Sequence, residues 1–226
     1  MSKKEIFKYA FVRSIPVMCS YIFLGIAYGI LMEKAGYGWY YSLIIGLVVY
    51  TGAFQFVLIS LMSSGASLLS IALTALFMNS RQVFYSLSFF KDFNLMGKAK
   101  PYMIHSLTDE TYAVNHTIML KDEDRRRVMF PLAVMCHFYW CLGGVLGGLI
   151  GLMIPFSTEG IDFCMTALFV IIFVGQWESA KSHFPAVVGL VVSGICLFVL
   201  GADRFMLPSL LIVSTILTIS NRGKES

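Results

Sequence analysis

The chain has 226 residues, of which 58% are hydrophobic and 13% are charged, with a mean hydropathy of +0.77 and a net charge of +4. Soluble domains usually carry about 25% charged and about 45–50% apolar residues. So few charged side chains cannot cover a globule of this size, and the composition excludes an ordinary soluble enzyme. The basic residues flank apolar runs, which is a topology signal and no indication of nucleic-acid binding. The sequence therefore predicts an all-α, polytopic helix bundle embedded in a lipid bilayer.

Apolar runs long enough to span a membrane follow one another along the chain. No charged residue occurs from Ala35 to Ser80, which leaves room for two helices of about 20 residues each, with Ser63-Ser64-Gly65 as the hinge. The runs lack the alternation over about ten residues that is typical of β-barrel strands. We predict a single transporter domain over 1–226, with spans at about 15–32, 40–62, 66–89, 128–153, 163–178, 185–201 and 206–220.

The more polar segment 102–120 decides whether the bundle has seven or eight spans. At helical spacing His105, Asp109 and His116 share one face, so the segment is either an interfacial amphipathic helix or an eighth span beside a cavity. Eight spans with the N-terminus inside and seven with it outside both place 11 basic residues inside and 5 outside. Both models put Lys121 and Arg125 in the cytoplasm. The first helix tends to dominate orientation, which favours an internal N-terminus.

A weak internal repeat relates the two halves of the chain. The motif Gly25-x-x-x-Gly29 resembles Gly143-x-x-x-Gly147, and residues 50–55 resemble residues 173–178. Secondary transporters often contain such repeats, with the substrate at the repeat interface. Chance similarity between apolar segments is the alternative.

Polar groups within apolar runs are costly and are often functional. A broken helix at Gly52 and Gln55 would free backbone groups to bind a ligand, and the alternative is a close helix contact in which Gln55 bonds a neighbouring helix. Asn79 and Arg81 interrupt the next run, and the planar guanidinium suits a carboxylate. The alternative is a span that ends at Met78, with Arg81 at the interface. These two pairs are the predicted substrate-binding residues.

A second polar group is predicted to couple transport to protons. It consists of His105, Asp109, Glu110 and His116, whose side chains titrate near physiological pH once burial shifts them. Asp109 is the first choice and Glu110 the weaker one, and the alternative is a solvated face of an interfacial helix. His137 is expected to be a buried histidine, since it has too few neighbours for a metal site.

Motifs for catalysis and for nucleotide binding are absent from the sequence. We therefore expect no enzyme activity, no cofactor and no metal. Energy for transport would have to come from an ion gradient, from the substrate gradient or from a partner.

Four motifs in order resemble those of the AzlC family, the large subunits of bacterial branched-chain amino acid exporters. They are Gly25-x-x-x-Gly29, Thr51 to Phe56, Asn79 to Ser86 and Leu107 to Thr111. The resemblance implies a multi-pass protein of the bacterial plasma (inner) membrane that exports leucine, isoleucine, valine and often methionine. It also implies a small membrane subunit of the AzlD type, and the Gly-rich face from Gly143 to Gly151 is expected to pack against partner helices.

Two functions from other classes remain open. The first is a passive channel or facilitator for small solutes, which needs no titrating residue and would show no proton dependence. The second is a non-transporting membrane scaffold subunit, which would bind no amino acid and whose loss would leave efflux unchanged.

Overall fold

The computed structural model describes residues 1–153, 170, 173–174, 177–178, 180, 182–201 and 205–222. Within these residues the chain is helical and contains no strand, which confirms the predicted all-α class. The predicted span 163–178 falls largely outside the described residues. The helices are α1 (Lys3–Lys34), α2 (Trp39–Val48), α3 (Gly52–Ser63), α4 (Leu68–Ser88), α5 (Phe90–Asn94), the 3-10 turn η1 (Gly97–Ala99), α6 (Lys100–His105), α7 (Asp109–His116), α8 (Asp122–Met153), α10 (Phe184–Leu200) and α11 (Met206–Arg222).

The chain forms two compact units. The first comprises Met1–Gly65 and Asn79–Ser157, and the second comprises Ala66–Met78 and Thr158–Ser226. In the second unit α10 and α11 pack against each other, and they match the helices predicted over 185–201 and 206–220. The grouping of all residues into one transporter domain stays a prediction.

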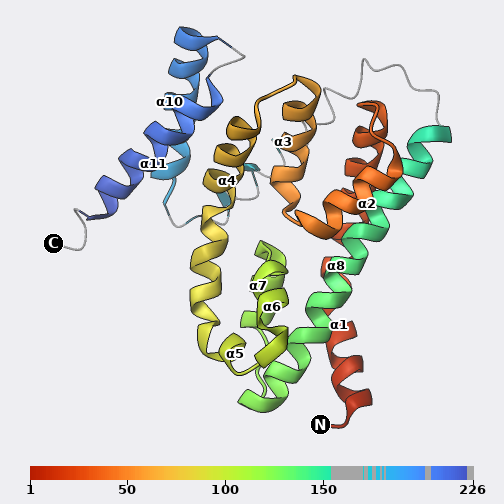
Figure 1. Ribbon diagram of the computed structural model, residues 1–226. Coiled ribbons are helices and arrows are strands. Elements are labelled where there is room, and N and C mark those ends of the chain that lie inside the picture. The colour runs from red at the N-terminus through yellow and green to blue at the C-terminus, as the bar shows by residue number, and fades with distance from the viewer. Residues whose placement is uncertain are drawn as a thin grey trace. The chain divides into compact units, whose positions relative to one another are not determined.

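Helices α1 and α8 form the centre of the first unit and lie side by side (Figure 1). Each has 32 residues, about 48 Å at 1.5 Å per residue, and each is long and apolar enough to cross a membrane. At one end the α-amino group of Met1 lies 3.2 Å from the Asp124 carboxylate. At the other end a Cβ added to Gly151 would lie 3.0 Å from the Cβ of Glu33. The two helices therefore run parallel, with both N-terminal ends on the same side.

Local signals at the start of α1 and α8 explain why both helices begin there. The Ser2 hydroxyl accepts from the Glu5 backbone N–H, and the Glu5 carboxylate accepts from the Ser2 N–H at 2.7 Å, which lowers the pKa of Glu5. Helix α8 opens with Asp122, Glu123 and Asp124, whose negative charges favour the positive end of the helix dipole.

The two Gly-x-x-x-Gly motifs face each other across the α1–α8 contact. A Cβ added to Gly25 would lie 2.9 Å from the Cα of Gly143, and one added to Gly29 would lie 2.6 Å from the backbone nitrogen of Gly148. Side chains larger than hydrogen cannot enter a contact this close, so glycine is required. The expectation that this face receives a partner subunit is wrong, because α1 and α2 already cover it.

The segment 40–62 is not one continuous helix, which confirms the broken-helix interpretation. Helix α2 ends at Val48, α3 begins at Gly52, and Tyr50 between them has a φ of +38°. That left-handed conformation is uncommon for a large side chain, so surrounding contacts must hold it. Tyr50 is 1% exposed.

The two halves of this segment run in opposite directions along α1 and α8. Helix α2 starts with Trp39 against Gly148 and ends where Tyr50 stacks on His137, about midway along α8. Helix α3 then heads back, since its Phe56 packs on Tyr28, closer to the C-terminal end of α1. Residues 39–63 therefore form a hairpin, here the first hairpin, which starts and finishes at the C-terminal ends of α1 and α8.

The segment 102–120 is also interrupted. Thr108 caps α7: its hydroxyl accepts from the Thr111 N–H at 3.4 Å, and the Thr111 hydroxyl accepts from the Thr108 N–H at 2.8 Å. A new helix therefore begins at Asp109. The prediction that His105 and Asp109 share one helical face is wrong, because the cap separates α6 from α7.

Helices α6 and α7 form a second hairpin, residues 100–116, which approaches from the other end. Tyr102 of α6 lies beside His137, with ring centroids 5.9 Å apart. Helix α7 leads back, since His116 packs on Phe89 and the Arg125 guanidinium lies over the same Phe89 ring near the start of α8. The second hairpin thus starts and finishes at the N-terminal ends of α1 and α8.

Helix α4 connects the two hairpins along the chain. It follows a turn at Gly65, whose φ is +67°, and its 21 residues are about 32 Å long. It ends beside α5, where Asp92 pairs with Arg125 at 3.7 Å and with Arg126 at 3.9 Å. The chain therefore returns to the N-terminal side before the second hairpin begins.

Candidate functional site

The tips of the two hairpins meet midway along α1 and α8. The ring of Tyr50, at the first tip, lies 4.1 Å from His137 of α8 and 6.5 Å from Tyr21 of α1, measured between centroids. Its centroid is 6.3 Å from that of His105, at the second tip. Irregular backbone at membrane depth is tolerated only where protein buries it or where it lines a cavity. We call this meeting point the tip site.

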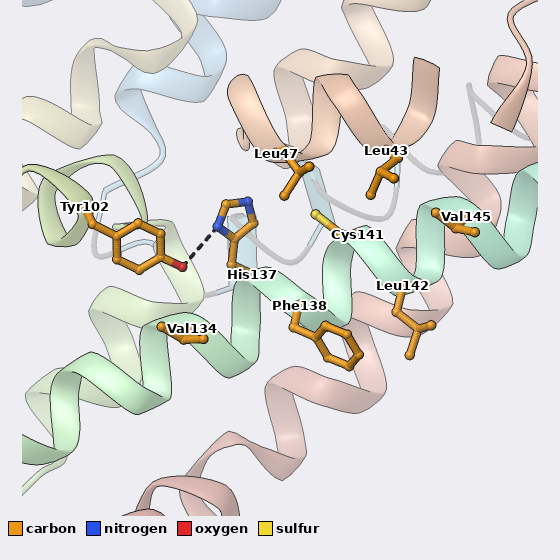
Figure 2. Close-up of a pocket in the computed structure, with 9 residues that line it drawn as sticks. All are labelled: Leu43, Leu47, Tyr102, Val134, His137, Phe138, Cys141, Leu142 and Val145. Atoms are coloured by element: carbon orange, nitrogen blue, oxygen red, sulfur yellow. Dashed lines mark hydrogen bonds between the residues drawn. The ribbon is translucent and has the colours of Figure 1, made fainter. Parts of the chain in front are cut away.

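Two histidines bind carbonyl groups at the C-terminal end of α2. The last carbonyl groups of a helix have no partner within it, and burial makes them costly. The Nε2 atom of His137 lies 3.1 Å from the Gly46 carbonyl oxygen, and that of His105 lies 3.4 Å from the Leu47 carbonyl oxygen. Because a carbonyl only accepts, each Nε2 must carry the proton. Nδ1 of His137 then accepts from the Tyr102 hydroxyl at 3.1 Å (Figure 2).

The opposite end of the break presents backbone N–H groups. No side chain caps α3, and its first helical bond runs from the Gln55 N–H to the Thr51 carbonyl. The preceding N–H groups, beginning at Gly52, sit at the positive end of the helix dipole, where anionic groups bind. Gly52 lies against the Trp140 ring, since a Cβ there would be 3.5 Å from that ring.

Buried polar atoms surround the start of α3. Gln55 is 0% exposed, and neither its amide nitrogen nor its amide oxygen forms a hydrogen bond of good geometry in the described part of the chain. The same is true of the Tyr28 hydroxyl, which lies beside the Gln55 amide, and of the Trp140 indole nitrogen. Leaving such a group unsatisfied costs about 1–3 kcal/mol. A ligand with polar ends would satisfy several of these atoms at once.

The second hairpin places a carboxylate in the tip site. Glu110 accepts from the Tyr21 hydroxyl at 2.8 Å, and that hydroxyl also lies 2.5 Å from the Thr108 hydroxyl. Tyr21 packs edge-on against Trp140, with centroids 5.4 Å apart, so Glu110 is tied to the aromatic wall beside Gly52. The residue that sequence reasoning ranked second is therefore the one connected to the tip site through a hydroxyl.

The other predicted residues are placed less closely together. Asp109 is half-buried at the start of α7, and Asn79 is half-buried within α4. His116 is exposed and packs on Phe89. The ring centroid of His105 lies 6.0 Å from that of His137, so the two histidines are neighbours in the tip site. The side chain of Arg81 lies outside the described residues.

The sequence did not indicate that Tyr21 and Trp140 belong to the tip site, or that His137 binds both hairpins. They lie on α1 and α8, far along the chain from Gln55, and no local spacing joins them. One signal was present for His137, since a histidine within an apolar run must find partners.

An open, apolar cavity of about 460 Å³ lies beside His137 (Figure 2). None of the predicted site residues whose side chains the structure describes lines it. Its lining comes from α2, α6 and α8: Leu43, Leu47, Tyr102, Val134, His137, Phe138, Cys141, Leu142 and Val145. The bond between Tyr102 and His137 therefore borders the cavity.

Comparison with known proteins places this architecture in a family. The model of the family described as AzlC protein matches residues 16–154. The branched-chain amino acid transport protein AzlC of Bacillus subtilis is 34% identical over 97% of this chain and 87% of its own length. An uncharacterized membrane protein of Haemophilus influenzae is 34% identical over 95% and 89%, and the inner membrane protein YgaZ of Escherichia coli is 27% identical over 82% and 79%. No solved structure matches.

The matched region holds α1 from residue 16 onward, α8, both hairpins and α4, and thus the whole tip site. The similarity to the Bacillus subtilis and Haemophilus influenzae proteins extends over nearly the full chain. The chain belongs to the AzlC family.

Proposed function

We propose that the chain is a secondary transporter that exports branched-chain amino acids across the bacterial inner membrane, coupled to protons and acting with a small AzlD-type subunit. One observation carries the proposal: two hairpins meet at buried polar groups that lack good partners. Discontinuous helices of this kind form substrate sites in secondary transporters. Family membership and the name of the Bacillus subtilis relative support the same substrate class.

The tip site offers a complement to each part of an amino acid. The N–H groups at Gly52 and the Gln55 amide suit the carboxylate, and Arg81 with Asn79 would add positive charge and a hydrogen-bond donor. Glu110 or Asp109 would take the ammonium group. The rings of Tyr28, Phe56 and Trp140 form an apolar wall for a branched side chain: the Tyr28 centroid lies 5.8 Å from that of Phe56 and 6.0 Å from that of Trp140.

The distribution of basic residues supports a cytoplasmic N-terminus. Eleven basic residues lie at the N-terminal side of α1 and α8: Lys3, Lys4, Lys8, Arg13, Lys91, Lys98, Lys100, Lys121, Arg125, Arg126 and Arg127. Up to Met153, the opposite side has only Lys34. Over the same residues, either continuous-span model places eight basic residues inside and four outside. The bias is stronger here because neither hairpin crosses the bilayer in this arrangement. We infer that α1, α4 and α8 cross and that the hairpins do not.

Cysteine labelling tests this topology. In a cysteine-free background we expect an impermeant maleimide added outside intact cells to label Ser64→Cys but neither Lys98→Cys nor Lys4→Cys, since only Ser64 lies on the outer side. The eight-span model predicts labelling of Lys98→Cys instead of Ser64→Cys. The seven-span model predicts labelling of Lys4→Cys. Either pattern would contradict the re-entrant topology.

Transport itself is tested with radiolabelled leucine. We expect cells that express this chain with its AzlD-type subunit to extrude leucine faster than cells with either chain alone, and a protonophore to abolish uphill efflux. In liposomes the purified chain alone is expected to transport little. Full transport by the isolated chain would contradict the need for a partner, and downhill flux that ignores the proton gradient would favour the passive channel.

A further inference from the structure

We propose that His137 is the residue that takes up the coupling proton. The proposal rests on the proposed transport function and deepens it. It differs from the assignment of coupling to Asp109, because His137 contacts both hairpins whereas Asp109 belongs to one.

His137 is the structural link between the two tips. Through Nε2 it binds the Gly46 carbonyl of the first hairpin, and through Nδ1 it binds the Tyr102 hydroxyl of the second. Its ring stacks on Tyr50, whose left-handed backbone marks the break. A change in the protonation of His137 therefore affects its contacts with both hairpins.

Uptake of a proton changes the bond to the second hairpin. Neutral His137 donates from Nε2 to Gly46 and accepts at Nδ1 from Tyr102. After protonation Nδ1 becomes a donor, so the Tyr102 hydroxyl must turn and accept instead. The bond to Gly46 remains, and the positive ring gains from the negative end of the α2 dipole. Protonation thus keeps the bond to the first hairpin and reverses the direction of the bond to the second.

A second histidine lies beside His137. His105 binds the neighbouring Leu47 carbonyl, and its ring lies 6.0 Å from His137, so two positive rings would repel each other. The other titratable groups around His137 are Tyr50 at the break, Tyr102 of α6, and Cys136 and Cys141 on α8. The Glu110 carboxylate of α7 is held by the Tyr21 hydroxyl of α1.

The variant His137→Gln separates coupling from structure. The glutamine amide can still donate to Gly46 but cannot take up a proton. We expect leucine counterflow to persist, uphill efflux to fall at least about tenfold, and the pH dependence of efflux to disappear. His183→Gln is the matched control, since His183 stacks on Trp177 in the second unit and belongs to neither predicted site, and it should keep the wild-type pH profile. An unchanged pH profile in His137→Gln would overturn the proposal.

Two further measurements decide the case if His137→Gln fails to fold. Tyr102→Phe removes the hydroxyl that binds Nδ1 of His137, so the pH midpoint of efflux should move, and an unchanged midpoint counts against the proposal. The chain has four histidines, so nitrogen-15 NMR of histidine-labelled wild type in lipid can resolve them, with Tyr102→Phe identifying His137. We expect the nitrogen-15 signals of His137 to change over the same pH range as leucine export. This readout needs no transport, so a failure of leucine export refutes the proposed function alone, and a His137 signal that never titrates refutes the proton site alone.

Discussion

Replacing Gly29 with alanine is expected to destabilise the first unit by at least about 2 kcal/mol and to lower the yield of folded protein. A Cβ at this position would lie 2.6 Å from the Gly148 backbone nitrogen and would also meet the Gly144 carbonyl oxygen. These are backbone atoms, which cannot rotate away as a side chain can. The helices must therefore separate, and with them the tip site that both helices support. Thermal unfolding of the purified protein in detergent measures the effect.

Gly194 in α10 provides the matched control for Gly29. A Cβ there would meet no atom within 4 Å in the described part of the chain. Because alanine favours a helix over glycine by about 1 kcal/mol, Gly194→Ala should leave the unfolding temperature unchanged or raise it. If Gly29→Ala behaved like Gly194→Ala, the close contact between α1 and α8 would be wrong.

The sequence was sufficient to locate apolar helices but not to show where a helix breaks and folds back. Hydropathy placed helices correctly around 15–32, 66–89, 128–153, 185–201 and 206–220, because an apolar run reports burial. The same signal cannot tell a helix that spans from two half-helices that fold back over 40–62. The fold-back depends on Tyr50 in a left-handed conformation and on two histidines that bind the end of α2. Both are tertiary effects.

The break between α6 and α7 could have been predicted from the sequence. Thr108 followed by Thr111 is a capping pattern, and two acidic residues between them favour a helix start. Periodicity outweighed this signal, and the resulting single helix placed His105 on the wrong face. The sequence related the glycine motifs at Gly25 and Gly143 as copies of a repeat, whereas in the structure these two motifs pack against each other.

The candidate site, too, could be predicted from the sequence only in part. Gly52 and Gln55 stood out because polar or helix-breaking residues within a long apolar run are rare. The groups that complete the site come from α1 and α8: Tyr28 lies beside the Gln55 amide, and Trp140 lies against Gly52. Such partners follow from the parallel packing of two helices that are separated in the chain by residues 35–121, which no local pattern encodes.

Replacing Gln55 with methionine is expected to stabilise the protein and to abolish transport. The Gln55 side chain is fully buried, and both of its amide atoms lack a hydrogen bond of good geometry within the described residues. Methionine has a similar shape and removes the cost of those atoms, so stability should rise by about 1 kcal/mol, which corresponds to about 2–4 °C in the unfolding temperature. If the amide binds the substrate carboxylate, leucine efflux should fall at least about tenfold.

Thr74 serves as the matched control for Gln55. It is 1% exposed in the second unit, and its hydroxyl lacks a good hydrogen bond among the described residues. Thr74→Val removes a buried polar atom in the same way, so it should also raise the unfolding temperature while leaving efflux near the wild-type rate. A residue kept for folding loses stability when it is replaced, whereas a residue kept for a ligand loses only function. Normal efflux from Gln55→Met would remove Gln55 from the substrate site, and a lower unfolding temperature would show that its amide supports the fold instead.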